Sequence, residues 1–398
     1  MFLDLIRRRN PALVEQAIAL HQAGRLPADT YVIDLDAVEA NARHIAGVAA
    51  RHGLKAYAMT KQMGRNGSFC RAAAKGGIGK AVAVDMECAR ATRRAGMGLG
   101  HLGHLVQVPR AEADAAASLA PDHWTVFNLE KAREAAAASH KRGRRQDLLL
   151  RIVAEGDRFY RGHEGGFAAA DVVALADAVD AIEGARFSGV TTFPSQLFDA
   201  ESRTVKPTPN LATLGRAAEA LARAGRSAIE INAPGTTSAA ILPMLAAAGA
   251  TQVEPGHGLT GTTPLHVFED LPEVPAVVYL SDVSNLVVGE AYCFGGGLYI
   301  DPVFPDYPVR AVVSREPTVA DAALAGVEIP VPAAIDYYGM IDAGGAVKPR
   351  VGDSVVFGFR PQAFVTRAYT AGVSGLSSGD PVVETIYDAF GRPADWPL

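Results

Sequence analysis

The stretch "KAYAMTKQMGRN", residues 55–66, sets the fold and raises a question about chemistry. Ala56 to Met59 form a short apolar run of the kind that buried strands have. Lys61 follows that run by two residues, and Gly64 then breaks the pattern. A lysine at such a place either reaches solvent as the strand ends or delivers its amine to a site.

Short β-type runs alternate with alanine-rich helical segments along the first two thirds of the chain. Such alternation predicts a parallel sheet with helices outside it. The nine runs are "YVIDL" (31–35), "KAYAM" (55–59), "AVAVD" (81–85), "HLVQV" (104–108), "WTVFN" (124–128), "LLLRIV" (148–153), "FSGVTT" (187–192), "AIEIN" (228–232) and "TQVE" (251–254).

Nine runs are one too many for a (β/α)₈ barrel. After about residue 275 valine, glycine and proline dominate, which favours a separate mostly-β domain. Assigning "YVIDL" to that domain leaves eight strands to close the barrel. The sequence therefore predicts an α/β protein with a TIM-type (β/α)₈ barrel and a C-terminal mostly-β domain. The expected boundaries are an N-terminal helical segment at 1–30, the barrel at 31–270, with its first strand joining the β domain, and the β domain at 271–398.

The strand count also locates two charged residues. "KAYAM" becomes barrel strand 1 and "TQVE" becomes strand 8, so Lys61 and Glu254 both follow the carboxyl ends of their strands. Barrel enzymes keep their chemistry at that end, and strands 1 and 8 are neighbours in a closed barrel. Lys61 and Glu254 are therefore expected to face one pocket.

The loops after strands 7 and 8 are candidates for binding phosphate. "NAPGTTSAA" brings Thr236, Thr237 and Ser238 to the start of a helix, and "EPGHGLTG" follows Glu254 with two glycines. Hydroxyls and unpaired N–H groups at a helix N-terminus form an anion site, although the same residues could serve only as an N-cap. A lysine, a phosphate loop and a carboxylate together suit pyridoxal phosphate.

These motifs resemble the fold-type III pyridoxal phosphate enzymes, the superfamily of alanine racemase and the ornithine and diaminopimelate decarboxylases, and within it the YhfX-type branch of alanine racemase-like proteins. The resemblance implies that Lys61 forms the Schiff base with the cofactor. It also implies that Glu254, in "EPG" as in the decarboxylases, keeps the pyridine nitrogen protonated. The other residues that it assigns to the cofactor are Arg65, Phe193, Thr236, Thr237, Ser238, Gly256, His257 and Tyr387.

On the substrate side the resemblance is looser. "GDRFYRGHEGGF" lies where the family has a substrate-binding arginine, so Arg158 or Arg161 takes that role. "AIDYYGMID" matches a turn near the substrate and makes Tyr337 and Tyr338 candidates.

The second acid or base is left open by the sequence. In the racemases a tyrosine of the partner subunit is the second group, but "GEAYCFGGG" has phenylalanine at that position. Tyr292 or Cys293 is then expected to replace it, if the reaction uses two bases. The decarboxylases place a cysteine in this domain as a proton donor, whereas a free cysteine in a strand is more often a core residue.

The expected function is a homodimeric amino-acid racemase or epimerase that removes the α-proton through a Schiff base on Lys61, with active sites shared between subunits. The alternatives are an amino-acid decarboxylase, favoured by Glu254 and Cys293, and a non-catalytic carrier of the cofactor. The metal-dependent relatives carry histidine and cysteine ligands in the C-terminal domain. Residues 269–398 contain no histidine, so no metal is expected.

Bulk properties limit the partners. A net charge of −5 offers no basic excess to neutralise nucleic-acid phosphates. No apolar stretch is long enough for a bilayer, and "MFLDLIRRRN" has its charges in the reverse order of a signal peptide. The three cysteines form no C-x-x-C pair, so we expect a cytoplasmic location. The family resemblance implies a small-molecule amino-acid substrate.

Overall fold

The computed structural model describes residues 1–300, 308–317, 319, 321–331 and 334–396. The chain divides into two compact units. The barrel unit comprises Arg43–Thr60 and Gly77–Gly256, and the β unit comprises Met1–Ala42, Lys61–Gly76 and His257–Leu398. Among the described residues, no helix is long and apolar enough to cross a membrane.

The barrel unit is a closed parallel sheet, because its first strand pairs with both its second and its last. That first strand is broken at Tyr57 into β2 and β3; β13 pairs with β2, and β3 pairs with β4. The order is β2-β13-β12-β9-β7-β6-β5-β4-β3, and the bounds are β2 Lys55–Ala56, β3 Ala58–Met59, β4 Lys80–Ala83, β5 Gly98–Leu102, β6 His123–Val126, β7 Gln146–Val153, β9 Ala185–Thr191, β12 Glu230–Asn232 and β13 Gln252–Val253. The fold class predicted from the sequence is confirmed.

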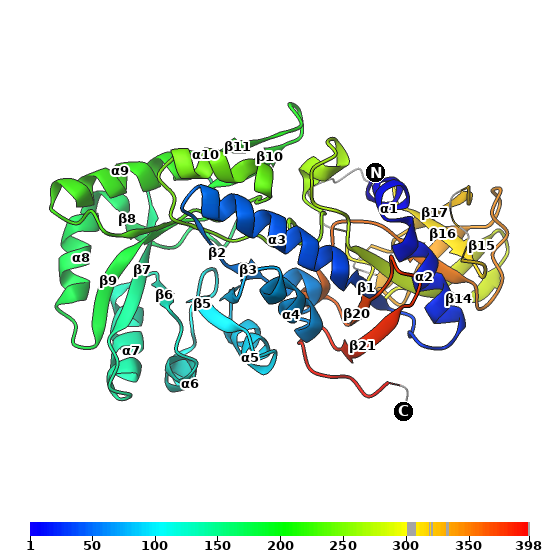
Figure 1. Cartoon of the computed structure of the whole chain (residues 1–398), viewed down its shortest axis with the longest axis horizontal. Helices are drawn as coiled ribbons and strands as arrows, with labels where there is room; N and C mark the ends of the chain where they lie inside the picture. Colours follow the sequence, from blue (N-terminus) through cyan, green and yellow to red (C-terminus); the bar gives the residue numbers. More distant parts are fainter. Residues whose placement is uncertain (301–307, 318, 320, 332–333, 397–398) are drawn as a thin grey trace. The chain divides into compact units, whose positions relative to one another are not determined.

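Alanine-rich helices lie outside these strands, as Figure 1 shows for α7, α8 and α9 beside β7 and β9. Alanine has the highest helix propensity, and polar caps such as Asn128, which accepts a hydrogen bond from the Lys131 N–H at 2.8 Å, start the helices. Their bounds are α5 Met86–Arg94, α6 Ala113–Ser118, α7 Leu129–His140, α8 Val172–Asp180, α9 Pro209–Arg223 and α10 Leu242–Ala247. A short strand β8 (Phe167–Ala168) and a hairpin, β10 (Gln196–Asp199) with β11 (Thr204–Pro207), complete the strands.

The third barrel strand was predicted in the wrong place. The sequence pattern favoured "HLVQV" (104–108), but the strand is β5, which ends at Leu102. Gly103 has a φ of +76°, which turns the chain out of the sheet, and Val106 is half exposed. The alternating pattern of the later segment is therefore that of a loop, and His101 lies inside the strand.

The β unit is a mostly antiparallel sheet that uses both ends of the chain. Its order is β15-β18-β17-β16-β19-β14-β1-β20-β21, and a further pairing of β15 with β14 closes six of the strands into a ring. β1 pairs with β14 and β20, as assigning "YVIDL" to this domain requires. The bounds are β1 Thr30–Asp34, β14 Val277–Val287, β15 Glu290–Phe294, β16 Arg310–Ser314, β17 Leu324–Glu328, β18 Tyr338–Asp342, β19 Ser354–Phe357, β20 Tyr369–Ser374 and β21 Val382–Tyr387.

Two N-terminal helices, α1 (Phe2–Arg9) and α2 (Pro11–Gln22), fill the core of the β unit. Leu13 and Ile18 are fully buried in a cluster with Val278 and Val356 of β14 and β19. The remaining helices are α3 (Leu35–Arg51) and α4 (Gly67–Lys75), and the 3₁₀ turn η1 (Lys61–Met63) lies between β3 and α4.

Candidate active site

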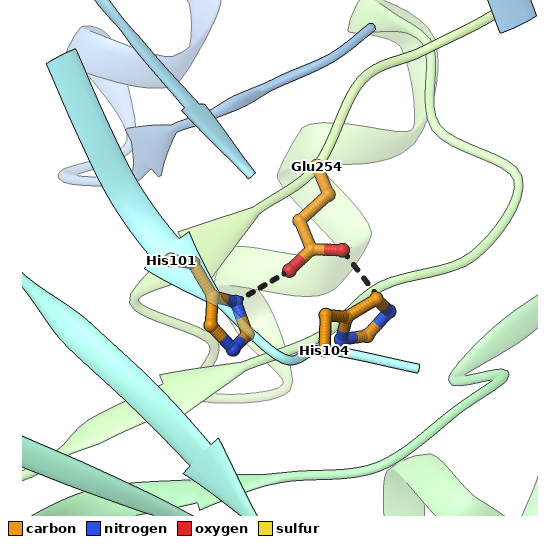
Figure 2. Close-up of side chains that lie close together, drawn as sticks. All are labelled: His101, His104 and Glu254. Carbon is orange, nitrogen blue, oxygen red and sulfur yellow. Dashed lines mark hydrogen bonds and ion pairs between the residues drawn. The ribbon is translucent and has the colours of Figure 1, made fainter. Parts of the chain in front are cut away.

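Glu254, directly after β13, is enclosed by two histidines in the barrel unit (Figure 2). His101 Nδ1 lies 2.9 Å from Glu254 Oε1, and His104 Nε2 lies 3.2 Å from Oε2. Asn232 at the end of β12 donates a hydrogen bond to Oε1 at 2.8 Å. The side chains of all three ionisable residues are at most 2% exposed, so this is a buried polar cluster at the carboxyl end of the barrel strands.

The cluster keeps Glu254 ionised. Burial by itself raises the pKa of a carboxyl group, but the charge of His104 and the hydrogen bonds from His101 and Asn232 outweigh it and lower the pKa of Glu254 below its usual value. Thr125 of β6 contacts the other ring nitrogen of His101. Glu254 can therefore serve as a fixed negative charge facing a cationic ligand.

His101, His104 and Glu254 are also residue types that bind transition metals. Their ligand atoms lie within 4.8 Å of one another, and two histidines with a carboxylate form a common zinc set. In this arrangement, however, each histidine nitrogen meets a different carboxylate oxygen at the distance of a direct hydrogen bond or ion pair.

Phe193, predicted to pack on the cofactor ring, lies among aromatic side chains after β9. The ring of His104 meets it edge-on with centroids 5.7 Å apart, and Tyr160 and His163 approach it to 5.9 Å. Phe193 and Glu254, which the sequence assigned to the same cofactor ring, are thus both in contact with His104.

Arg151 is a buried cation that the sequence reading missed. It lies in β7, is 1% exposed, and donates hydrogen bonds from Nη2 to the carbonyls of His163 and Phe193. The ring of Phe127 is 4.8 Å from its guanidinium carbon. Burial lowers its pKa to about 10, and no carboxylate of the described residues forms an ion pair with it. Its charge is one that an anionic ligand would balance.

The two arginines that the sequence proposed for the substrate lie in the loop after β7. The side chain of Arg161 is 99% exposed and forms an ion pair with Glu164. The backbone of Arg158 is fixed by Asn210, which accepts from its N–H at 2.8 Å and donates to its carbonyl at 3.1 Å. Arg151, rather than either of them, is the buried arginine of this region.

The loop "NAPGTTS" packs against the residues that follow β9. Gly235 is required there, because a Cβ would lie 2.4 Å from the Gln196 carbonyl oxygen, to which the Thr236 N–H donates. Gln196 Nε2 donates to Thr237 Oγ1 at 3.2 Å. Ser238 stands at the N-cap position of a three-residue 3₁₀ turn without a capping hydrogen bond, and the helix that follows, α10, is only six residues long. The predicted phosphate role of this loop therefore rests on its hydroxyls and not on a long helix.

Gly256 closes the barrel unit after Glu254, and His257 opens the next segment of the β unit. His257 donates from Nε2 to the Pro361 carbonyl at 2.8 Å. Burial lowers the pKa of its imidazole well below the usual value, so the ring is neutral.

Lys61 and Arg65 lie together in the β unit. The Lys61 ammonium is 4.9 Å from the centroid of the Phe364 ring, and the Arg65 guanidinium is 5.9 Å from the same ring. Arg65 has a positive φ of 58° and donates to the Ala389 carbonyl at 2.9 Å. The same hydrogen bond ties the segment after Lys61 to the C-terminal residues.

Tyr387 at the end of β21 reaches the first turn of α4. A Cβ on Gly67 would lie 2.5 Å from the Tyr387 hydroxyl, so a larger residue there would displace this tyrosine. The predicted cofactor residues Lys61, Arg65 and Tyr387 therefore belong to one compact unit, and Glu254 and Phe193 belong to the other.

Tyr292 and Cys293 face opposite sides of β15. Tyr292 packs against Tyr338 of β18 with ring centroids 5.9 Å apart. Cys293 is fully buried, its thiol donates to the Gly339 carbonyl at 3.6 Å, and burial raises its pKa to about 12. Tyr337 is exposed and lies against the guanidinium of Arg367. Of the two candidates for the second acid or base, Cys293 has the surroundings of a core residue.

His101, His104 and Arg151 were detectable in the sequence. The first two stand three residues apart in "GHLGHL", and Arg151 is a charge inside an otherwise apolar strand. Both histidines were missed because the predicted third strand (104–108) put His104 at the start of a strand instead of beyond a strand end.

Comparison with known proteins identifies the family. Residues 33–264 match the model of the alanine racemase N-terminal domain, and residues 278–383 match that of the YhfX-like C-terminal domain. The chain is 38% identical, over 98% of its length and 99% of the relative's, to a protein of Escherichia coli (strain K12) described as "Uncharacterized protein YhfX".

Solved structures share the fold at low identity. D-threonine aldolase from Filomicrobium marinum aligns over 93% of this chain and 96% of its own, with a TM-score of 0.67 and 19% identity. Alanine racemase of Clostridium difficile 630 in complex with cycloserine aligns over 92% and 99%, with a TM-score of 0.65 and 16% identity. D-threo-3-hydroxyaspartate dehydratase from Delftia sp. HT23 aligns over 90% and 97%, with a TM-score of 0.63 and 16% identity. The chain therefore belongs to the alanine racemase-like family of fold-type III pyridoxal phosphate enzymes, in its YhfX-type branch.

Proposed function

We propose that this protein is a pyridoxal phosphate-dependent amino-acid racemase or epimerase, with Lys61 as the amine that binds the cofactor. The observation that carries the cofactor part of the proposal is the ionised, buried Glu254 at the carboxyl end of the barrel. A carboxylate held in this way is the partner that a protonated pyridine ring requires. Pyridoxal phosphate supplies a ring that withdraws electrons from the substrate's α-carbon.

The donors and acceptors of the barrel unit fit this cofactor. Glu254 Oε2 has no well-aligned hydrogen bond among the described residues, so it can accept one from a ring N–H. Beside the hydroxyl loop, Ser195 Oγ and Gln196 Oε1 are buried and have no hydrogen-bond partner in the described part of the chain. Polar atoms of this kind indicate a polar ligand, because leaving them unpaired in the interior costs free energy. The hydroxyls of Thr236, Thr237 and Ser238 would hold the phosphate.

Arg151 supports an amino acid as the substrate. Its buried charge has no acidic partner in the described structure, and a carboxylate with two oxygens matches the planar guanidinium. We assign the substrate carboxylate to Arg151. Arg151→Lys is expected to raise KM about tenfold or more, the size of effect that loss of a charged hydrogen bond typically has. Arg161→Lys, at an exposed position, is the matched control and should leave KM unchanged.

For the second acid or base we favour Tyr292 over Cys293, because the Cys293 thiol is buried and its pKa is about 12. In the racemases that this chain resembles, this group comes from the partner subunit, so we propose a homodimer with shared sites. Tyr292→Phe should abolish racemisation while Lys61 still exchanges the α-proton of one enantiomer with solvent deuterium. Cys293→Ala should retain racemisation. Loss of activity in the cysteine variant only would reverse this assignment.

Borohydride reduction tests the proposal directly. The purified protein is loaded with pyridoxal phosphate, reduced, digested, and its modified peptide identified by mass spectrometry. The label is expected on Lys61 and should be absent from the Lys61→Ala variant. A label on another lysine, or none, would contradict the role of Lys61.

A decarboxylase is the second candidate, because Glu254 stands where the decarboxylases have their carboxylate. Solvent-deuterium exchange at the α-carbon, without release of carbon dioxide, would favour the racemase. Stoichiometric carbon dioxide would favour the decarboxylase. If the protein binds the cofactor but catalyses neither reaction with any amino acid of a panel, the result would favour a carrier of the cofactor.

A further inference from the structure

His104 contacts two residues that the family resemblance assigns to the same cofactor ring. Its Nε2 lies 3.2 Å from Glu254 Oε2, and its ring stands at 88° to the ring of Phe193, with centroids 5.7 Å apart. It is 1% exposed, and the ring of His101 lies 5.3 Å away. A single side chain therefore touches both the carboxylate and the ring-facing phenylalanine.

His101 fixes the other oxygen of the same carboxylate. In the tautomer that satisfies every contact, the Thr125 hydroxyl donates to Nε2 of His101, and Nδ1–H donates to Glu254 Oε1. Asn232 donates to Oε1 as well and is itself held by Thr191 at 3.0 Å. A carboxylate oxygen has two lone pairs, so Oε1 is fully used and Oε2 keeps capacity for one more donor.

We propose that His101 and His104 are positioning residues that hold Glu254 ionised, with Oε2 turned toward the protonated ring nitrogen of a heterocyclic cofactor, and that His104 joins this carboxylate to Phe193 as one unit. The inference rests on the proposed function, and it adds the two residues that control the protonation of the ring. Neither histidine touches the substrate in this scheme.

Two further ionisable residues of the barrel unit, Tyr57 and His123, interact with members of this cluster. Tyr57, between β2 and β3, is an ionisable group that interacts with Glu254, and its pKa is raised, first by burial, so it stays neutral. His123, the register partner of His101 on β6, interacts with His101, and its own pKa is lowered, first by burial. His101, His104 and Glu254 are therefore the residues that the test varies.

The experiment measures the ring nitrogen itself. Holoprotein is prepared with pyridoxal phosphate labelled with ¹⁵N in the ring, and the ¹⁵N chemical shift is followed from pH 6 to 9. His104→Gln keeps a donor but loses the ability to carry charge, and His104→Phe loses both. His101→Gln tests the second contact. His123→Gln changes a buried histidine that bonds to Ser188 and serves as the matched control.

The wild type and His123→Gln are expected to keep the ring nitrogen protonated throughout the range. His104→Gln and His101→Gln weaken the interactions that hold Glu254 ionised, so each should lower the pKa of the ring nitrogen by about one unit, a tenfold change in its proton affinity. His104→Phe should lower it by more. In active variants, kcat should fall about tenfold with KM little changed, because the substrate contacts are intact. Thermal unfolding of each variant reports whether it folds; if His104→Phe does not, the glutamine variants decide.

Three outcomes would overturn the inference. The first is that every histidine variant has the same ¹⁵N chemical shift as the wild type. The second is that the ring nitrogen of the wild type is unprotonated. The third is a stoichiometric transition metal in the purified protein that is lost in His104→Gln and Glu254→Gln, which would make the cluster a metal site. Failure of the wild type to bind the cofactor at all would instead refute the proposed function.

Discussion

Charged residues have different surroundings at the two ends of the barrel. At the amino ends of the strands a cleft of about 610 Å³ is lined by Lys55, Lys80, Asp122, Glu230 and their neighbours. The ion pairs there are partly exposed, as in Lys55–Glu230, whose side chains are 56% and 19% exposed. At the carboxyl ends the single carboxylate of Glu254 is buried between two histidines.

The buried histidines His101 and His123 also differ in their contacts. They are register partners on β5 and β6, and both are buried. His101 meets a carboxylate, whereas the described side-chain contact of His123 is with the Ser188 hydroxyl, and burial lowers its pKa to about 4. Two buried histidines in register therefore differ in their partners, a carboxylate for His101 and a hydroxyl for His123.

The largest effect should come from neutralising the buried carboxylate. Glu254→Gln is expected to lower kcat by about 100-fold or more, since loss of one preorganised electrostatic group typically costs that much. Glu230→Gln at the opposite end should change kcat by less than about twofold, because this partly exposed pair lies away from the candidate site. Steady-state kinetics of the holoprotein compares the two. Equal losses would remove the functional distinction between the ends.

Stability should differ in the same direction. Glu254→Ala leaves two buried histidines without their partner and is expected to lower the free energy of unfolding by about 3 kcal/mol. Glu230→Ala breaks a partly exposed pair and should cost at most about 1 kcal/mol. Chemical denaturation of the protein without cofactor measures both. A larger loss for Glu230→Ala would show that the amino end is the better packed of the two.

His123 should make the protein sensitive to acid. Its folded-state pKa of about 4 lies below the usual 6.5, so between these values the unfolded chain binds more protons than the folded one. Stability is therefore complete above pH 6.5 and is lost as the pH falls toward 4, by about 1–3 kcal/mol. His123→Gln should flatten that part of the profile of unfolding free energy against pH. An unchanged slope in the variant would assign the acid sensitivity to other groups.

The smallest effect concerns salt. A double-mutant cycle of Lys55 and Glu230 should give a coupling of about 0.5 kcal/mol that disappears in roughly 1 M salt, because exposed pairs are screened. The corresponding cycle of His104 and Glu254 should keep its coupling energy under the same conditions. A coupling between Lys55 and Glu230 that survives high salt would mean that this pair is shielded from solvent.

The sequence predicted the parts that depend on a regular pattern. Alternating strands and helices and the change of texture near residue 275 gave the fold class, and the strand count put Glu254 after the last barrel strand. The partners of Glu254 were missed, because "HLVQV" alternates as well as a strand does and only the turn at Gly103 excludes it. Arg151 was missed for a different reason. Whether an arginine inside an apolar strand is buried depends on rings from distant loops, such as Phe127, which no local pattern records.

The position of β1 has a consequence for the synthesis of the chain. β1 ends at Asp34, but its neighbours β14 and β20 begin at Val277 and Tyr369. The apolar faces of α1 and α2 also lack their packing partners until β14 and β19 have been synthesised. At about 5–20 residues per second, the roughly 240 residues up to β14 take on the order of 10–50 s on the ribosome. During that time the N-terminal helices and an unpaired strand are exposed on the nascent chain. We therefore expect that chains arrested before residue 277 bind chaperones that recognise apolar segments, and that release of the full-length chain ends this binding.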